Sequence, residues 1–441
     1  MSFRTWMVSA ISAAALFFLY FFGLGRSGML GPDEPRYAAI GREMARSGDW
    51  ITPRLNDKPW FEKPALLYWM TAAGFETGLD DDLAPRLPVA IVGVSFLIFY
   101  FFLLRRELGL KPAAFSTCIL GTSAGWLAYS HIAVTDLPMS AAFGAAMLLV
   151  QAGFVIPAGI CLGLAILGKG LVPLVLFLPA IWFFRQKAFI ALGIGILVAL
   201  PWYALVTVRN GSDFLYQFFW VQHFSRFTTG ALMHVRPFWF FVPVLLAGLF
   251  PWTPLLALLF RRELYRGRRV QFWITGFVLG FLFFSLSQNK LPGYLLPLLP
   301  LLTAVCGLAL AEARRADWVL ASAAILLCLV PIIEGVLPQA LISGVSHAHF
   351  DPPYRVLIPV LCLAAACFLL PRTFAVGFIA ICVTLSVISV IWVTYPMLDR
   401  TVSARAYYRA RPEGELCSPN PNRSWRYGLD YYAHREIPDC K

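Results

Sequence analysis

The sequence has 441 residues, of which 59% are hydrophobic and 14% are charged. Water-soluble domains contain about 45–50% apolar and about 25% charged residues, so this composition excludes soluble, disordered, collagen-like and coiled-coil proteins. The mean hydropathy of +0.70 and the long continuous apolar runs predict an all-α polytopic membrane protein, because a transmembrane β-barrel would show short alternating strands. The net charge is +12. Since no DNA- or RNA-binding motif accompanies this excess, we attribute it to membrane lipids and cytoplasmic loops and expect no nucleic-acid partner.

Apolar runs of about twenty residues, the length that crosses a hydrocarbon core of about 30 Å, predict about thirteen transmembrane helices. They are placed at 5–25, 86–104, 112–130, 137–151, 154–168, 170–184, 188–208, 237–260, 270–287, 293–311, 317–339, 355–371 and 374–394. The first run has no small-residue cleavage site before Arg26, so it is predicted to be an uncleaved span.

Positive residues gather in alternate loops, which fixes the predicted orientation. With a cytoplasmic N-terminus, the inside loops contain Arg105, Arg106, Lys111, Arg185, Lys187, Arg261, Arg262, Arg266, Arg268, Arg269, Arg314, Arg315 and Arg372. The transmembrane domain is then 1–394, with two long outside loops at 26–85 and 209–236. The tail 395–441 also lies outside, in the periplasm of a Gram-negative cell, and the membrane is the cytoplasmic (inner) one.

Two of the nine cysteines, Cys417 and Cys440, lie in this polar tail. They can form a disulfide if the tail is outside the cytoplasm, because extracytoplasmic compartments are oxidising. The other seven lie in apolar runs, where cysteine behaves as a small hydrophobic residue.

Ionisable residues near a bilayer are costly, so their positions are informative. The unusual ones all fall on the outside face: Asp33, Glu34, Arg36, Glu62, Lys63, Asp136, Lys169, His223, Arg226 and Lys290. Each also has an ordinary explanation. The acidic residues can begin helices, the lysines can reach toward lipid headgroups or lie in a loop, and His223 can pack at the interface.

As a group, however, cations beside carboxylates suit phosphate chemistry at a membrane surface. A carboxylate there can orient or deprotonate an acceptor. No His-Glu-x-x-His zinc motif, Walker loop or dinucleotide-binding glycine pattern is present, so nothing supports ATP-driven transport.

The first outside loop resembles that of the bacterial lipid A 4-amino-4-deoxy-L-arabinose transferases. These are grouped with the protein O-mannosyltransferases among the C-type, polyprenyl-phosphate-dependent glycosyltransferases. The resemblance lies in Asp-Glu-Pro-Arg-Tyr at 33–37, Ser-Gly-Asp-Trp at 47–50, Pro-Arg-Leu-Asn at 53–56 and Phe-Glu-Lys-Pro-Ala-Leu at 61–66. Later matches are Thr135-Asp136, Gly168-Lys169-Gly170, His223-Phe224-x-Arg226-Phe227, Pro237-Phe238-Trp239 and Lys290-Leu291-Pro292-x-Tyr294. The resemblance spans at least 1–300, and the tail is shorter than the terminal periplasmic domain of those enzymes.

The resemblance implies a C-type fold with interfacial helices in the first loop and an enzyme that moves a sugar from undecaprenyl phosphate to lipid A or a related acceptor. It implies catalytic positions for Asp33, Glu34 and Asp136. It implies donor-phosphate or lipid contacts for Arg36, Tyr37, Lys63, Lys169, Arg226, Lys290 and Tyr294. No cofactor is expected to be required. Glu62 and His223 have side chains that can ligate a metal, so the sequence leaves open whether a divalent ion binds. Protein O-glycosylation and a lipid-linked sugar transporter are the alternative functions.

Overall fold

The computed structural model describes residues 3–440 apart from 226–234, 345–361, 364–365, 413–414 and 420–421. Within these ranges the α-helices are α1 Phe3–Tyr20, α2 Asp33–Ser47, α3 Leu66–Glu76, α4 Leu83–Leu108, α5 Leu110–Gly121, α6 Ala124–Ser130, α7 Asp136–Ala152, α8 Val155–Lys169, α9 Val172–Leu176, α10 Leu178–Leu215, α12 Phe241–Gly248, α13 Arg268–Leu286, α14 Leu299–Glu312, α15 Asp317–Leu326, α16 Val330–Ser343, α18 Arg372–Ser389, α19 Tyr395–Thr401, α20 Arg405–Arg409 and α21 Arg423–Ala433. Shorter 3-10 or π segments are η1 Tyr216–Ser225, η2 Phe238–Phe240, η3 Thr253–Phe260, η4 Arg262–Arg266, η5 Pro292–Leu298, η6 Leu327–Leu329 and η9 Val390–Thr394. The strands β1 Arg54–Leu55 and β2 Lys58–Pro59 form a small antiparallel hairpin.

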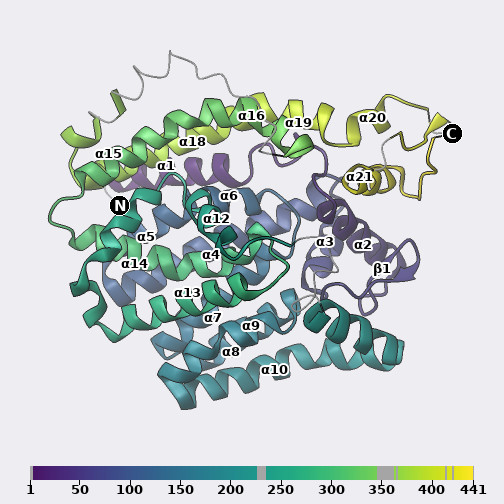
Figure 1. The fold of residues 1–441 in the computed structure, drawn as a ribbon, viewed down its shortest axis with the longest axis horizontal. Helices are drawn as coiled ribbons and strands as arrows, with labels where there is room; N and C mark the ends of the chain where they lie inside the picture. The colour runs from purple at the N-terminus through teal and green to yellow at the C-terminus, as the bar shows by residue number, and fades with distance from the viewer. Residues whose placement is uncertain are drawn as a thin grey trace.

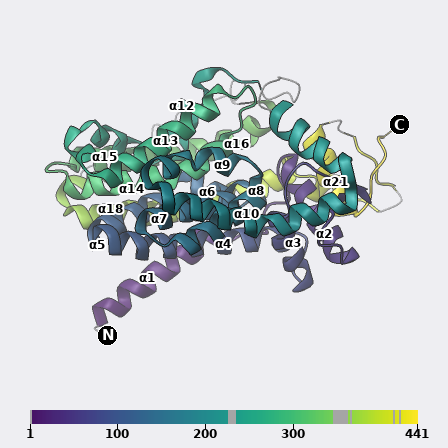
Figure 2. The same cartoon turned by 90° about the horizontal axis from the view of Figure 1, so that it is seen from below.

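The helices pack in layers that run along the long axis of the molecule (Figure 1). One layer contains α1, α15, α16 and α18, a central layer contains α4, α5, α13 and α14, and a third contains α7, α8 and α10. The elements α2, α3, α20 and α21 gather at one end, and Figure 2 shows α2, α3 and α21 grouped there from below. The chain is therefore a multi-pass helical protein with a polar assembly at one end of its bundle.

Six of the described helical segments are long and apolar enough to cross a membrane, and a bent pair is a seventh candidate. The six are Leu83–Leu108, Leu178–Gln222, Arg268–Leu286, Pro292–Glu312, Asp317–Ile342 and Arg372–Thr401. Three shorter apolar helices accompany them, at Ile11–Tyr20, Asp136–Ala152 and Val155–Lys169. The structure therefore supports the predicted membrane class but not the predicted count of thirteen spans.

The differences have local causes. The predicted span 112–130 is divided into α5 and α6, because the chain leaves the helix at 122–123. The predicted span 237–260 is bent by 109° between α12 and η3, where Pro251 cannot donate a backbone hydrogen bond. The break predicted before 188–208 is present as a kink at Arg185 within α10. The predicted span 355–371 lies largely outside the described residues.

The loops with positive residues contact one another, as a shared membrane face requires. Arg269 donates to the Glu107 carbonyl over 2.5 Å, Arg268 to that of Phe183 over 2.7 Å, and Arg372 to that of Leu310 over 3.0 Å. These contacts involve four segments: the loop after α4, the part of α10 before its kink, the residues after η4 and the loop after α14. The alternation of charge along the sequence therefore corresponds to one end of the folded molecule.

The first outside loop forms α2, the hairpin and α3. Helix α2 ends at Ser47 because Gly48 takes φ +67°, a left-handed conformation that glycine adopts without strain. A Cβ at Gly41 would lie 2.5 Å from the Thr71 side chain, so glycine permits the close packing of α2 on α3. This packing holds the polar start of α2 against the bundle.

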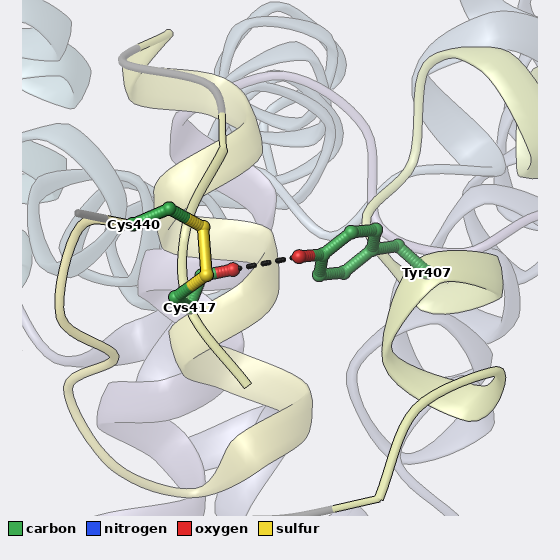
Figure 3. Close-up of a disulfide and its surroundings, with 3 residues drawn as sticks. All are labelled: Tyr407, Cys417 and Cys440. Atoms are coloured by element: carbon green, nitrogen blue, oxygen red, sulfur yellow. Dashed lines mark hydrogen bonds between the residues drawn. A yellow bond between two sulfur atoms is a disulfide. The ribbon is translucent and has the colours of Figure 1, made fainter. Parts of the chain in front are cut away.

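The tail packs onto this loop. Cys417 and Cys440 form the disulfide expected from their position, with a Cα–Cα distance of 4.8 Å. The Tyr407 hydroxyl donates to the Cys417 carbonyl over 2.8 Å (Figure 3). Helix α21 is capped by Asn422, whose side chain accepts from the Ser424 amide, and the helix contacts α2. The tail is therefore a folded layer over the first loop.

Candidate active site

The first group of candidate residues is assembled at the start of α2. Asp33 and Arg36 are three residues apart on this helix, so they share a face and form an ion pair. Arg36 Nη1 lies 3.1 Å from Glu62 Oε2, and Lys63 Nζ lies 3.0 Å from Glu62 Oε1. The Asp33 side chain is 38% exposed, whereas that of Arg36 is 5% exposed. The cluster offers one accessible carboxylate backed by two cations, an arrangement that can bind a phosphorylated ligand.

The surroundings of Arg36 keep it charged. Burial alone would lower the pKa of Arg36, but Glu62, Tyr37 and Asp33 more than reverse this effect and raise it. The pKa of Tyr37 is raised well above its ordinary value, first by burial and then by Glu62 and Asp33. Tyr37 is therefore a neutral phenol, and it donates to Glu62 Oε1 over 3.4 Å.

Two buried donors near this cluster have no hydrogen-bond partner among the described residues: the Tyr68 hydroxyl and Trp60 Nε1. The Tyr68 side chain lies within range of the charges of Glu62, Arg36 and Asp33. The Trp60 ring lies 5.5 Å from the Arg36 guanidinium carbon. Because buried polar atoms are nearly always satisfied, these two atoms are candidates to contact a ligand.

Glu34, although adjacent to Asp33, occupies a different environment. It is 0% exposed, and its Oε1 lies 2.7 Å from Arg86 Nε. The same carboxylate accepts the amides of Leu30 over 2.8 Å and Ala133 over 3.0 Å. Arg86 also donates to backbone carbonyls before α2. These contacts give Glu34 the position of a buried anchor for the residues before α2, on a different side of the helix from Asp33.

The second group lies where α7 and α8 meet. Asp136 begins α7 and Lys169 ends α8, so these antiparallel helices bring the two side chains together at 2.5 Å. Each charge is also favourably placed relative to its helix dipole. Lys169 Nζ lies 4.6 Å from the Tyr294 ring. A Cβ at Gly293 would lie 2.5 Å from Asp136 Oδ1, so only glycine allows this turn to approach the carboxylate.

The two groups face a common side chain. Tyr129, at the end of α6, lies within range of the charges of both Asp136 and Asp33. Tyr129 was not predicted as a site residue, because a tyrosine at the end of an apolar run is typical of any membrane interface. The fold thus brings together residues about one hundred positions apart.

The remaining predicted residues are placed differently. Lys290 donates to the carbonyls of Ser287 and, over 3.1 Å, of Arg236, and burial lowers its pKa. It braces the turn before η5. Arg226 and the side chain of His223 lie outside the described residues.

The metal candidate Glu62 lies between Arg36 and Lys63, a setting that does not suit a divalent cation. Among the described residues, no three His, Cys, Asp or Glu side chains group as metal ligands. No step is therefore assigned to a metal at Glu62.

Arg86 was missed as a site-supporting residue, although the sequence contains a signal for it. It lies at the outside end of the predicted span 86–104, where the positive-inside rule disfavours arginine. In the structure its side chain is 1% exposed and is held by Glu34. An arginine at the outside end of a span predicts a nearby carboxylate, and for Arg86 that carboxylate is Glu34 of the first motif.

Known proteins resemble this chain in sequence and in fold. No protein-family model matches the chain. Two curated proteins named undecaprenyl phosphate-α-4-amino-4-deoxy-L-arabinose arabinosyl transferase are similar to it. The one from Edwardsiella ictaluri is 36% identical over 315 residues, which is 64% of this chain and 56% of the relative. The one from Pseudomonas aeruginosa (strain UCBPP-PA14) is 32% identical over 337 residues, which is 71% of this chain and 60% of the relative.

Among solved structures, the crystal structure of ArnT from Cupriavidus metallidurans bound to undecaprenyl phosphate has a TM-score of 0.81 at 24% identity. The match covers 99% of this chain and 86% of the ArnT chain. The chain is similar to these arabinosyl transferases in sequence and in fold. The oligosaccharyltransferase of Archaeoglobus fulgidus, with a TM-score of 0.54 at 13% identity over 99% of this chain and 64% of its own, shares the fold.

The fold class expected from the first-loop motifs is thereby confirmed as that of the C-type glycosyltransferases. The chain spans little more than half the length of the two curated relatives. Its multi-pass membrane character is supported both by the relatives and by the apolar helices.

Proposed function

We propose that the chain is a glycosyltransferase that moves a sugar from undecaprenyl phosphate to lipid A or a related acceptor at the periplasmic face of the inner membrane. The observation that carries the proposal is the accessible Asp33 carboxylate paired with Arg36, which also binds Glu62, the partner of Lys63, at one end of an apolar helical bundle. The named activity of the relatives supports the donor, and the alternating charge of the loops supports the orientation.

Arg36 and Lys63 are proposed to hold the donor phosphate, with Tyr37 positioning Glu62 between them. Bound phosphate would compete with Glu62 for both cations, and the buried site strengthens each charged hydrogen bond. Lys169 and Tyr294 are proposed as further lipid-phosphate contacts, and Asp136 as the second acidic position.

The proposed reaction breaks the bond between the anomeric carbon of the sugar and the phosphate oxygen of the carrier. An acceptor oxygen forms the new bond to the same carbon from the opposite face, with inversion, and undecaprenyl monophosphate leaves with the electron pair. Nearby cations offset the charge that develops on this leaving group. An acceptor hydroxyl would give its proton to Asp33. An ionised acceptor phosphate has no proton to give, and Asp33 would then orient Lys63 or the sugar amine.

Substituting Asp33 tests the proposal in proteoliposomes that contain labelled donor and lipid A. Asp33→Asn is expected to lower sugar transfer by about 100-fold or more, because it removes the accessible negative charge of the cluster. Asp317→Asn is the matched control, since Asp317 is exposed at the opposite end, at the start of α15. Mass spectrometry of the lipid A measures the product.

Full transfer by Asp33→Asn would refute the role of Asp33. Translocation of the labelled lipid by the native chain without any sugar transfer would show that the chain is a transporter and not a transferase. Labelled protein with unchanged lipid A would replace the acceptor with a polypeptide.

A further inference from the structure

A cavity of about 560 Å³ lies between α2, the β1–β2 hairpin and α21. Its volume is within the range of small-molecule sites, about 300–1,000 Å³. Arg36 lines one wall and also forms the ion pair with Asp33. Tyr427 of α21 lines another wall, and its ring lies 5.1 Å from the Arg36 guanidinium carbon. The cavity is thus adjacent to the candidate catalytic carboxylate and is completed by the tail.

Among the described residues, Arg46 forms no ion pair with a carboxylate, and Arg54 forms only a long one, with Glu43 also within range of its charge. Arg46 Nη2 lies 3.0 Å from His434 Nδ1, which accepts the hydrogen bond through its neutral nitrogen lone pair. Arg54 lies 3.9 Å from Asp49, a carboxylate that Arg209 already binds at 2.8 Å. Both guanidiniums therefore retain capacity for an anion.

The acidic side chains of the cavity are partly occupied by the protein itself. Glu43 accepts the Asp57 amide over 3.1 Å, and Asp430 accepts the Ile437 amide over 2.8 Å. Burial raises the pKa of both carboxyl groups above their ordinary values. Their remaining oxygen lone pairs can accept hydrogen bonds from hydroxyl groups.

We propose that this cavity binds the phosphorylated saccharide headgroup of the acceptor, with Arg46 and Arg54 on its phosphate and Tyr427 against its sugar ring. Arginine suits phosphate through its planar pair of donors, and an aromatic ring offers an apolar face to a sugar. The site deepens the function proposed above and rests on it, because the acceptor must lie next to Asp33 for transfer to occur.

The test measures binding to the full chain in lipid nanodiscs by titration calorimetry. The probes are a phosphorylated glucosamine disaccharide without acyl chains, the same disaccharide without phosphate, and inorganic phosphate. The native chain is expected to bind the phosphorylated disaccharide at least about tenfold more tightly than either other probe. The double variant Arg46→Gln/Arg54→Gln is expected to lose about tenfold or more of that affinity. Arg400→Gln, an exposed arginine of α19 away from the cavity, is expected to lose none.

Binding of undecaprenyl phosphate reports folding and is expected to be unchanged in all three proteins. Native affinity in the double variant, or equal affinity for the unphosphorylated disaccharide, would overturn the proposal. Equal affinity for inorganic phosphate would also overturn it, as the mark of a simple anion site. The two proposals separate cleanly: a chain that binds the headgroup through Arg46 and Arg54 but transfers no sugar contradicts the proposed function alone. A chain that transfers sugar while the double variant keeps native headgroup affinity contradicts the cavity alone.

Discussion

The first outside loop and the C-terminal tail meet at the same end of the molecule, but they contribute different things (Figure 1). The loop supplies the accessible carboxylate and the cations of the candidate site. The tail supplies buried groups that hold the loop. Arg405, 5% exposed, lies 2.5 Å from Asp82 and donates to the Gly25 and Arg26 carbonyls over 2.8 Å each. The Tyr432 hydroxyl accepts the Met29 amide over 2.9 Å.

This division suggests that chemistry and geometry are carried by separate residues. The residues before Asp33 are held by two arginines. Arg86 donates a hydrogen bond to the Ser27 carbonyl, and Arg405 of the tail donates one to the Arg26 carbonyl. Substitutions in the reactive cluster should therefore change turnover at constant stability. Substitutions among the buried anchors should change stability first, because they leave a charge in the interior without its partner.

Glu34 and Asp33 are adjacent in sequence, and substituting Glu34 is expected to have the largest effect on stability. Glu34→Gln is expected to lower the free energy of unfolding by about 3–5 kcal/mol, because Arg86 would keep its charge in a buried site without a carboxylate. Thermal unfolding in detergent measures this loss. Asp33→Asn is the control, since its partly exposed side chain can be replaced with little cost to folding. Equal melting temperatures for both variants would contradict the assignment of Glu34 as an anchor.

A similar but smaller loss is expected in the tail. Arg405→Gln is expected to cost roughly 2–3 kcal/mol, because glutamine can retain some of the hydrogen bonds to the carbonyls before α2 but cannot pair with Asp82. Thermal unfolding and the rate of tryptic cleavage in the tail report it. Arg411→Gln, an exposed arginine nearby, should change stability by no more than about 0.5 kcal/mol. If both variants behave alike, the tail is not an anchor of the loop.

The sequence predicted the membrane class and the tail disulfide and placed Asp136 and Lys169 on the same face of the membrane, because each of these depends on composition or on a local pattern. It did not predict the pairing of Glu34 with Arg86 or of Arg405 with Asp82. These partners lie 52 and 323 positions apart, and no periodicity links them. The predicted count of thirteen spans is not confirmed among the described residues, where α7 and α8 are shorter apolar helices that end at the half-buried pair Asp136 and Lys169. Local sequence patterns were sufficient for the first group of predictions, whereas the pairing of residues distant in sequence is seen only in the folded structure.

Tyr68 allows a test of the cluster without a change of charge. Its hydroxyl has no partner among the described side chains, so Tyr68→Phe should leave the free energy of unfolding unchanged or slightly higher. Sugar transfer is nevertheless expected to fall by about tenfold if the hydroxyl contacts the donor. Tyr100→Phe is the matched control. Its hydroxyl donates to the Pro300 carbonyl over 2.7 Å, so its loss should cost about 1 kcal/mol of stability. Unchanged transfer by Tyr68→Phe would remove it from the donor site.

The smallest expected effect concerns the charge of the cavity that the loop and the tail share. Asp430→Asn removes a carboxylate that burial already makes harder to ionise, and it is expected to strengthen binding of the phosphorylated disaccharide by about two- to fivefold. In the native chain the pKa of Asp430 is raised, so lowering the pH toward that value protonates it and should strengthen binding in the same direction. The variant should lack the part of this pH dependence that Asp430 contributes, while the part from Glu43 remains. Titration calorimetry from neutral to mildly acidic pH measures both. Identical pH profiles for the native chain and the variant would show that the charge of Asp430 does not act on the bound ligand, and the role of the tail in the site would then rest on Tyr427.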